Sequence, residues 1–137
     1  MFALHPQLAK DCVVVIDLPL SQVLLLNDSH YPWTILVPRR ENIREIFQLE
    51  VEDQRQLLTE SSVVSAAMAA YFNADKMNVA ALGNMVPQLH VHHIVRCQND
   101  PAWPNPVWGA VAANPYSDKN LQARVQELRQ LLANCEL

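Results

Sequence analysis

Glycine is scarce in this sequence, with two residues among 137. Loops that cradle phosphate, of the P-loop or the dinucleotide-binding type, need several glycines in fixed register, so the sequence excludes both. It also contains no GxSxG turn and no HExxH helix, which are signatures of serine hydrolases and zinc peptidases. Any phosphate bound by this chain must therefore contact side chains or the edge of a helix or strand.

Basic charge and long apolar runs are also lacking. Ten Lys and Arg stand against fourteen Asp and Glu, a formal net charge of -4, which gives no long-range attraction to a nucleic-acid polymer. No apolar run approaches the roughly 20 residues that a membrane span needs, so we expect neither partner. The cysteines, Cys12, Cys97 and Cys135, have no CxxC spacing, and no basic-then-apolar leader begins the chain. These features predict free thiols and a cytoplasmic location.

Five short runs rich in apolar and β-branched residues predict strands. They are VVVID at 13–17, QVLLLND at 22–28, WTILVP at 33–38, MNVAAL at 77–82 and QLHVHHIV at 88–95. The first two are separated by the short step LPL and the last two by the turn dipeptide Gly83-Asn84, which indicates hairpins. Pro38 cannot donate to a sheet and marks a strand exit.

Two helices complete the expected fold. Apolar residues recur at helical spacing between Glu50 and Asn73, which predicts one long central helix. Ser117 is the expected N-cap of a last helix, whose apolar stripe is Leu121, Val125, Leu128, Leu131 and Leu132. The sequence therefore predicts an α+β fold: a five-stranded antiparallel sheet with one long central helix and a C-terminal helix.

The run PQLHVHHIVR at 87–96 carries three of the five histidines. Side chains at i and i+2 share one face of a strand, so Gln88, His90 and His92 line one face while His93 lies on the apolar face. Neighbours on one face are roughly 7 Å apart, so one imidazole can attack phosphorus while the next contacts its oxygens. For His93 we expect only hydrogen bonds within the core.

A metal site is an alternative for the same run, because imidazole is a common zinc ligand. The run contains no carboxylate, and the chain offers only His5 and His30 as further imidazoles. A histidine-ligated metal protein is therefore the less favoured interpretation, and His30 is expected to be a solvated turn residue.

The segment VPQLHVHHIVR resembles the signature of the histidine triad (HIT) family, His-φ-His-φ-His-φ-φ, where φ is apolar. In that motif Gln88 takes the first position, His90 the second and His92 the third. The likeness extends to LLLNDSHYPWTILVPR and MNVAALGN, on either side of the long helix. It implies a single HIT-like domain over 1–137, with a core at 13–96 and a C-terminal segment and helix at 97–137. It also implies a homodimer.

The resemblance implies a hydrolase or transferase that acts on a phosphate ester, anhydride or phosphoramidate of a nucleotide, such as a diadenosine polyphosphate. His90 would attack the α-phosphorus to form a nucleotidyl-histidine, which water then hydrolyses. His92 would bind phosphate oxygens, and Gln88 would have an orienting role in the site. Asn27 would hold the ribose hydroxyls, and Asn84 would contact the phosphate or leaving group. The resemblance requires no cofactor and no metal, although a divalent cation can accompany a polyphosphate.

The sequence departs from the family pattern at four positions. Gln88 replaces a histidine and cannot carry a proton at pH 7. Trp33 stands where many members have a further histidine, Met85 stands where a Ser or Thr is common, and His93 occupies an apolar position of the motif. A nucleotide-binding module without turnover is therefore the rival interpretation.

Two tryptophans lie in the proline-rich segment DPAWPNPVWG at 100–109. Rigid aromatic side chains offer a stacking surface, so Trp103 and Trp108 are candidates for the wall of a nucleobase pocket. The favoured alternative is that this segment packs over the sheet or across a dimer interface.

Overall fold

The protein, described by a computed structural model over residues 1–137, contains three α-helices, five strands and one short 3-10 helix. In chain order these are α1 Pro6–Asp11, β1 Cys12–Asp17, β2 Ser21–Leu26, β3 Trp33–Pro38, η1 Ile46–Gln48, α2 Val51–Tyr71, β4 Lys76–Ala80, β5 Val91–Arg96 and α3 Asp118–Ala133. The predicted α+β fold is confirmed, because the five strands form one antiparallel sheet beside the long helix and the C-terminal helix.

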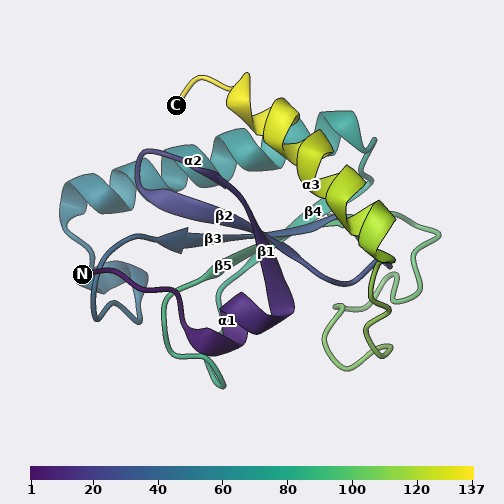
Figure 1. Ribbon diagram of the computed structural model, residues 1–137, viewed down its shortest axis with the longest axis horizontal. Helices are drawn as coiled ribbons and strands as arrows, with labels where there is room; N and C mark the ends of the chain where they lie inside the picture. The colour runs from purple at the N-terminus through teal and green to yellow at the C-terminus, as the bar shows by residue number, and fades with distance from the viewer.

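The strands are ordered β1-β2-β3-β5-β4, and every neighbouring pair is antiparallel (Figure 1). β5 lies between β3 and β4, with His92 opposite Ile35 in the register. Every residue of β3 and of β5 is buried. A buried polar side chain is costly unless it is hydrogen-bonded, so each histidine of β5 needs a partner.

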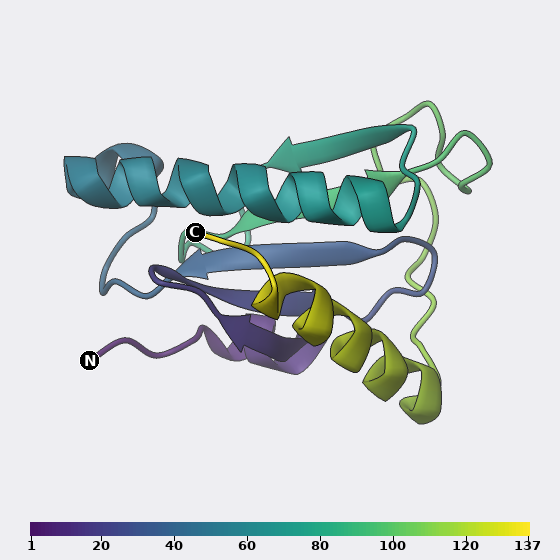
Figure 2. The same ribbon diagram turned by 90° about the horizontal axis from the view of Figure 1, so that it is seen from above.

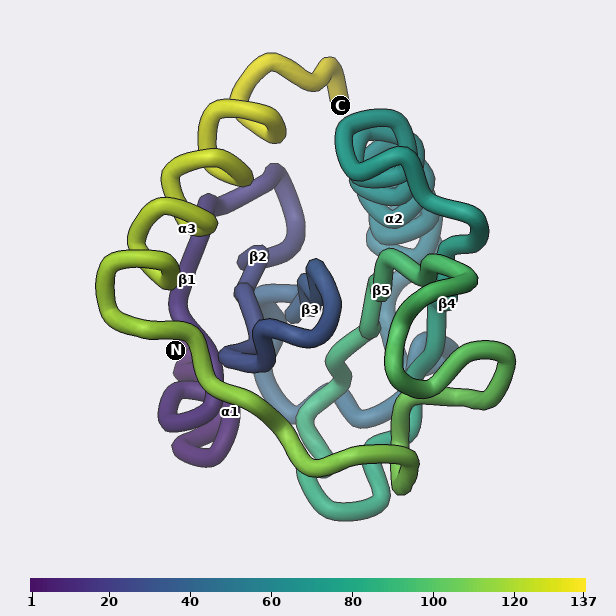
Figure 3. The backbone as a smooth tube through the Cα atoms, turned by 90° about the vertical axis from the view of Figure 1, so that its right-hand side faces the viewer, coloured from purple at the N-terminus to yellow at the C-terminus, as the bar shows by residue number.

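Both long helices cover the same face of the sheet. In Figures 2 and 3, α2 lies beside β5 and β4 while α3 lies beside β1, and the apolar residues between these helices and the sheet form one core cluster. A second cluster, which includes Leu8, Trp33 and Ile94, covers the opposite face. The alternation predicted for the histidine run is therefore confirmed in β5, because Val91 and Val95 belong to the helix-side core while Ile94 belongs to the other.

The two long helices form where the sequence predicts them. In α2, Leu57, Val64 and Met68 are buried against the sheet, at spacings that bring them to one side of a helix. Asn73 takes a left-handed conformation with φ 51°, which ends this helix at the predicted place. Ser117 caps α3 by accepting the Asn120 N–H at 3.2 Å. No helix of the protein combines the length and apolarity needed to cross a membrane.

Glu60 is a buried residue of α2 whose role the sequence did not indicate. Its carboxylate accepts the backbone N–H groups of Leu20 at 2.7 Å and Ser21 at 3.0 Å. Hydrogen bonds to a charged acceptor are stronger than neutral ones. Glu60 therefore ties the turn between β1 and β2 to the long helix.

One helix was missed and one expectation about local structure was wrong. The helix α1 was not predicted, because its six residues are too few to show a periodic pattern. The predicted two-residue turn at Gly83-Asn84 belongs to a ten-residue loop, 81–90, since β4 ends at Ala80 and β5 begins at Val91. Gly83 does take a positive φ of 77°, but Pro87 has no N–H to extend the pairing. Gln88 and His90 therefore precede the strand.

Candidate functional site

A cavity of about 550 Å³ lies on the face of the sheet opposite α2 and α3. Its wall comes from α1, from β2 and β3, from the loop 81–90, from the start of β5 and from the segment after β5. The lining residues are His5, Gln7, Leu8, Asp11, Leu26, Ile35, Leu82, Gly83, Asn84, Met85, Val86, His90, His92 and Trp108. The structure thus brings His90, His92 and Asn84 to one cavity.

The hydrogen bond of His90 determines which ring nitrogen carries the proton. Nδ1 lies 2.7 Å from the carbonyl oxygen of Gln88. A carbonyl oxygen can only accept, so Nδ1 donates, and the neutral ring has its lone pair on Nε2. Nε2 therefore has the electron pair that a nucleophile needs.

His92 has the opposite tautomer. The indole Nε1–H of Trp33 donates to His92 Nδ1 at 3.0 Å, and an indole can only donate. The proton of the neutral ring is therefore on Nε2. Burial, and then the nearby His90 and His93, lower the pKa of His92 to about 3, so this ring is an uncharged N–H donor at neutral pH.

The two imidazoles lie against each other in the cavity. Their ring centroids are 5.0 Å apart, with the planes at 71°. One ring has a free lone pair and the other a free N–H. Together they can attack an electrophile and hydrogen-bond to one of its oxygens, which is a combination suited to phosphoryl or nucleotidyl transfer.

His93 lies on the other face of β5, as predicted, and has no exposed surface. Its Nδ1–H donates to the Val91 carbonyl at 3.1 Å, which leaves Nε2 to accept the Ser61 hydroxyl at 2.7 Å. Burial lowers the pKa of His93 to about 4, against the opposing effect of the bond to Val91. Both ring nitrogens are satisfied within the core.

Gln88 does not face the cavity with its side chain, contrary to expectation. Its Oε1 accepts the His5 backbone N–H at 2.8 Å, and its Nε2 donates to the Ala3 carbonyl at 2.9 Å. Gln88 precedes β5, so the alternation of a strand does not apply to it. It contacts the His90 ring through its backbone carbonyl alone.

Asn27 also lies outside the cavity wall, although the sequence suggested a contact with ribose. Its Oδ1 accepts the Tyr116 backbone N–H at 2.9 Å. The side chain thus holds the segment that leads into α3, a long-range contact that the sequence did not indicate. His30 likewise lies away from the cavity, with Nδ1 2.9 Å from the Asp28 carboxylate.

Trp33 and Trp108 form an aromatic wall beside His92. Their ring centroids are 5.6 Å apart, and the Trp108 centroid is 5.0 Å from that of His92, all in edge-to-face arrangements. Trp33 is buried while Trp108 is part of the cavity lining. Trp108 thus lines the cavity, as its predicted role in the wall of a nucleobase pocket requires, and that role stays a prediction. Trp103 lies elsewhere, beside the Arg96 guanidinium.

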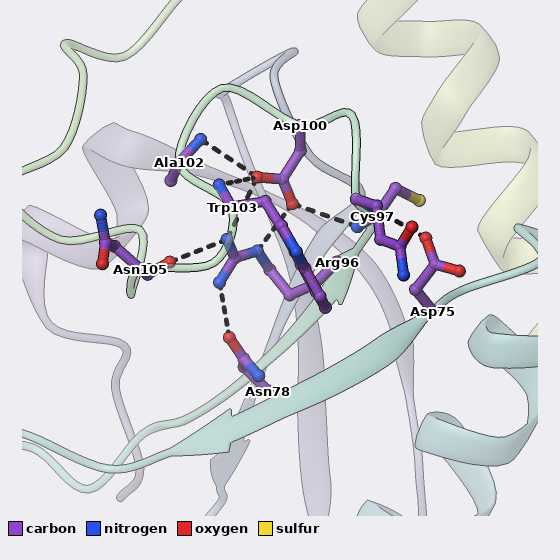
Figure 4. A network of polar contacts seen from close by, with 9 residues as sticks. Asp75, Asn78, Arg96, Cys97, Asp100, Ala102, Trp103 and Asn105 are labelled. Atoms are coloured by element: carbon purple, nitrogen blue, oxygen red, sulfur yellow. Dashed lines mark hydrogen bonds and ion pairs between the residues drawn. The ribbon is translucent and has the colours of Figure 1, made fainter.

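The segment that carries Trp108 is held in place by Arg96 at the end of β5 (Figure 4). The Arg96 guanidinium pairs with both carboxylate oxygens of Asp100, at 2.8 and 3.1 Å, and also contacts Asn78 and the Asn105 carbonyl. Burial raises the pKa of the Asp100 carboxyl, but hydrogen bonds from Arg96 and three backbone N–H groups outweigh it and leave that pKa below its ordinary value. This buried pair fixes the start of the segment.

The sequence did not identify the residues that α1 contributes to the cavity: His5, Gln7, Leu8 and Asp11. Pro6 at the first helical position was the available signal, since proline is favoured there. No three His, Cys, Asp or Glu side chains lie close enough together to hold a metal ion.

Comparison with known proteins identifies the family. The HIT domain profile matches residues 7–99, so the chain belongs to the histidine triad family. No functionally curated protein matches it significantly. The likeness seen in the motif and its flanking strands is thereby confirmed.

Several solved structures share the fold. A histidine triad protein from Marinobacter aquaeolei VT8 is 52% identical over 99% of both chains, with a TM-score of 0.95. One from Bradyrhizobium japonicum is 46% identical over 94% of this chain and 96% of its own, with a TM-score of 0.91. The diadenosine triphosphate hydrolase of Plasmodium falciparum is 18% identical over 88% of this chain and 76% of its own, with a TM-score of 0.63. This last similarity is one of fold.

Proposed function

We propose that this protein hydrolyses or transfers a nucleotidyl group through a covalent intermediate on His90. The opposite tautomers of His90 and His92 carry the proposal: a backbone carbonyl leaves the lone pair of His90 on Nε2, and an indole N–H leaves the proton of His92 on Nε2. A nucleophile and a hydrogen-bond donor thus stand side by side in one cavity.

In the first step, the lone pair of His90 Nε2 attacks the α-phosphorus of the substrate. The Nε2–P bond forms while the bond from phosphorus to the leaving oxygen or nitrogen breaks, and the leaving group takes that electron pair and a proton from solvent. The His90 ring becomes cationic, and the Gln88 carbonyl, which accepts from Nδ1–H, stabilises this charge. His92 donates Nε2–H to a non-bridging phosphate oxygen.

In the second step, water attacks the same phosphorus. The new P–O bond forms, the P–Nε2 bond breaks, and its electron pair returns to His90. One water proton is released to solvent, and the product is a nucleoside monophosphate. Splitting one displacement into two easier ones is the advantage of nucleophilic catalysis.

The family and the lining of the cavity support the proposed substrate class. We propose a phosphate ester, anhydride or phosphoramidate of a nucleotide, either a diadenosine polyphosphate or a nucleoside phosphoramidate. Asn84 lines the cavity as the donor for the phosphate or leaving group, with the exposed Met85 beside it instead of a hydroxyl residue. The proposed steps need no cofactor, and a polyphosphate substrate can bring its own divalent cation.

The intermediate provides a direct test. The protein is mixed with a nucleoside phosphoramidate or a diadenosine polyphosphate, quenched within the first turnover and digested for mass spectrometry. We expect one nucleotidyl group on the peptide that contains His90, and no modification in His90→Ala. Turnover by His90→Ala at the wild-type rate would refute the mechanism.

A nucleotide-binding module without turnover is the alternative, favoured by the absence of a hydroxyl residue at Met85. It predicts that wild-type protein and His90→Ala bind a nucleoside monophosphate equally and that neither consumes either substrate. A binding titration beside the turnover assay separates the two functions.

We also propose a homodimer through the edge strand β4. An apolar groove of about 540 Å³ beside β4 includes Leu58, 68% exposed, and Val79, 50% exposed. Unpaired edge strands favour pairing with another strand, and a two-fold axis would put the same groove on both copies. Sedimentation should give a dimer for the wild type and a monomer for Val79→Lys; a wild-type monomer would refute the proposal.

A further inference from the structure

The cavity contains a third imidazole, that of His5, which neither the motif nor the proposed steps use. His5 ends an N-terminal strap, residues 1–5, that leads into α1. The Gln88 carboxamide forms two hydrogen bonds with this strap: it accepts the His5 backbone N–H at 2.8 Å and donates to the Ala3 carbonyl at 2.9 Å. The position of His5 therefore depends on the residue that replaces the first histidine of the motif.

The His5 ring also has a defined tautomer. Its Nδ1 accepts the Gln7 backbone N–H at 3.0 Å and so caps α1. A backbone N–H can only donate, so the proton of the neutral ring is on Nε2. No other group of the protein is hydrogen-bonded to Nε2, and His5 reaches the cavity wall. The Nε2–H group is thus left without a hydrogen-bond partner in the protein, on a residue that lines the cavity.

The charge of the cavity makes such a donor important. No Lys or Arg is among the lining residues, and Asp11 is acidic. Phosphate oxygens must therefore be bound by neutral donors, of which His92 Nε2–H and the Asn84 amide are two. A second imidazole N–H would add a hydrogen bond to a charged acceptor, the stronger kind.

Gln88 connects His5 to the nucleophile. Its backbone carbonyl holds His90 Nδ1 at 2.7 Å, and its side-chain oxygen holds the His5 backbone N–H at 2.8 Å. The strap is therefore attached at the His90 end of the cavity, where the phosphate of a substrate would lie.

We propose that His5 binds a phosphate oxygen of the nucleotide through Nε2–H and that Gln88 is the positioning residue that docks it. This inference rests on the proposed function, since it concerns the ligand of the same cavity. The imidazole lost from the motif at Gln88 is thus replaced by one from the N-terminal strap, and the replacing glutamine holds that strap.

The test separates the capping role of His5 from ligand binding. Asparagine is a good N-cap, so His5→Asn keeps the acceptor for the Gln7 N–H and removes the imidazole. Titration calorimetry then compares adenosine 5′-monophosphate with adenosine. We expect His5→Asn to weaken binding of the monophosphate about tenfold and binding of adenosine less than about twofold, because only the monophosphate has the charged acceptor.

The matched control is His30→Asn, which changes a histidine outside the cavity and should leave both affinities unchanged. Gln88→Ala should weaken monophosphate binding to a similar degree, by releasing the strap. The double variant His5→Asn/Gln88→Ala should bind no more weakly than His5→Asn, because Gln88 acts through His5. Additive losses would overturn the positioning role, and thermal melting confirms that each variant is folded.

Failure of this inference and failure of the proposed function give different results. If the wild type binds the monophosphate and His5→Asn binds it equally well, the role of His5 is refuted while the role of His90 stands. Equal losses for adenosine and for the monophosphate would also refute the phosphate contact. If the wild type binds neither compound, both proposals are refuted.

Discussion

His92 and His93 are neighbours in the chain, but their side chains lie in different environments on the two faces of β5. His92 reaches an open cavity and accepts a hydrogen bond from Trp33, whereas His93 lies in the core and is bonded at both ring nitrogens. Burial lowers the pKa of both rings, to about 3 and about 4. Two imidazoles that are both uncharged thus differ in one respect: only His92 has a ring nitrogen left for a ligand.

The largest expected effect comes from removing the imidazole on the cavity face. His92→Ala should lower kcat/KM about 100-fold, the usual cost of losing one donor to a developing charge. The free energy of unfolding should fall by less than about 1 kcal/mol, since water entering the cavity can accept the Trp33 N–H. Steady-state kinetics and urea denaturation measure the two quantities. Wild-type kcat/KM in this variant would contradict the assigned role.

The folded protein should become less stable at low pH, because His93 is held neutral in the core. Because its pKa is below the ordinary 6.5 in the folded chain, the unfolded chain binds more protons below about pH 6.5. The free energy of unfolding should therefore fall as pH drops from about 6.5 to about 4, by about 3 kcal/mol for His93. His92 should add to the fall in the same direction.

Urea unfolding at pH 7 and pH 4.5 measures this change. His93→Leu, which fills the same buried place without a titratable group, should lose less stability between the two pH values than the wild type. An equal loss in the two proteins would show that other groups cause it.

Trp33→Phe should remove the hydrogen bond that fixes the tautomer of His92, while keeping an aromatic ring beside it. Without the indole N–H, Nδ1 can carry the proton, and part of the population loses the Nε2–H donor. We expect kcat/KM to fall about tenfold, the effect of one weakened hydrogen bond of ~1.4 kcal/mol. Nitrogen-15 NMR of the ring should show a mixture of tautomers; a spectrum unchanged from wild type would refute the assignment.

The smallest effect is expected on the core face. Ser61→Ala removes the hydroxyl that His93 Nε2 accepts at 2.7 Å, so the free energy of unfolding should fall by about 1 kcal/mol. Turnover should change less than about twofold, because the candidate cavity lies on the opposite face of β5. Urea denaturation and the kinetic assay check both statements, and a large loss of kcat/KM would show that the two faces are coupled.

Much of the fold was predictable because burial follows short-range periodicity. Alternation in the histidine run placed His92 and His93 on opposite faces, and helical spacing predicted α2 and α3. The hairpin turn was wrong because a Gly-Asn pair indicates a change of direction without specifying the length of the loop. The helix α1 was missed because six residues are too few to show a period.

The candidate site was predictable only in part. The sequence identified His90 and His92, and both lie in the cavity. It also suggested Gln88 and Asn27, whose side chains are bonded instead to the N-terminal strap and to Tyr116. These partners are 83 to 89 residues away in the chain, and no local pattern identifies contacts over such separations.

The sequence by itself determined the five strands, the two long helices, the family and the faces of the histidine run, because each depends on residues close together in the chain or on a contiguous motif. Only the tertiary structure decided the tautomer of His92 and the arrival of His5 and Trp108 at the cavity. A ring proton follows the one donor or acceptor that packs against it. For His92 that is an indole 59 residues away, on the neighbouring strand of the sheet.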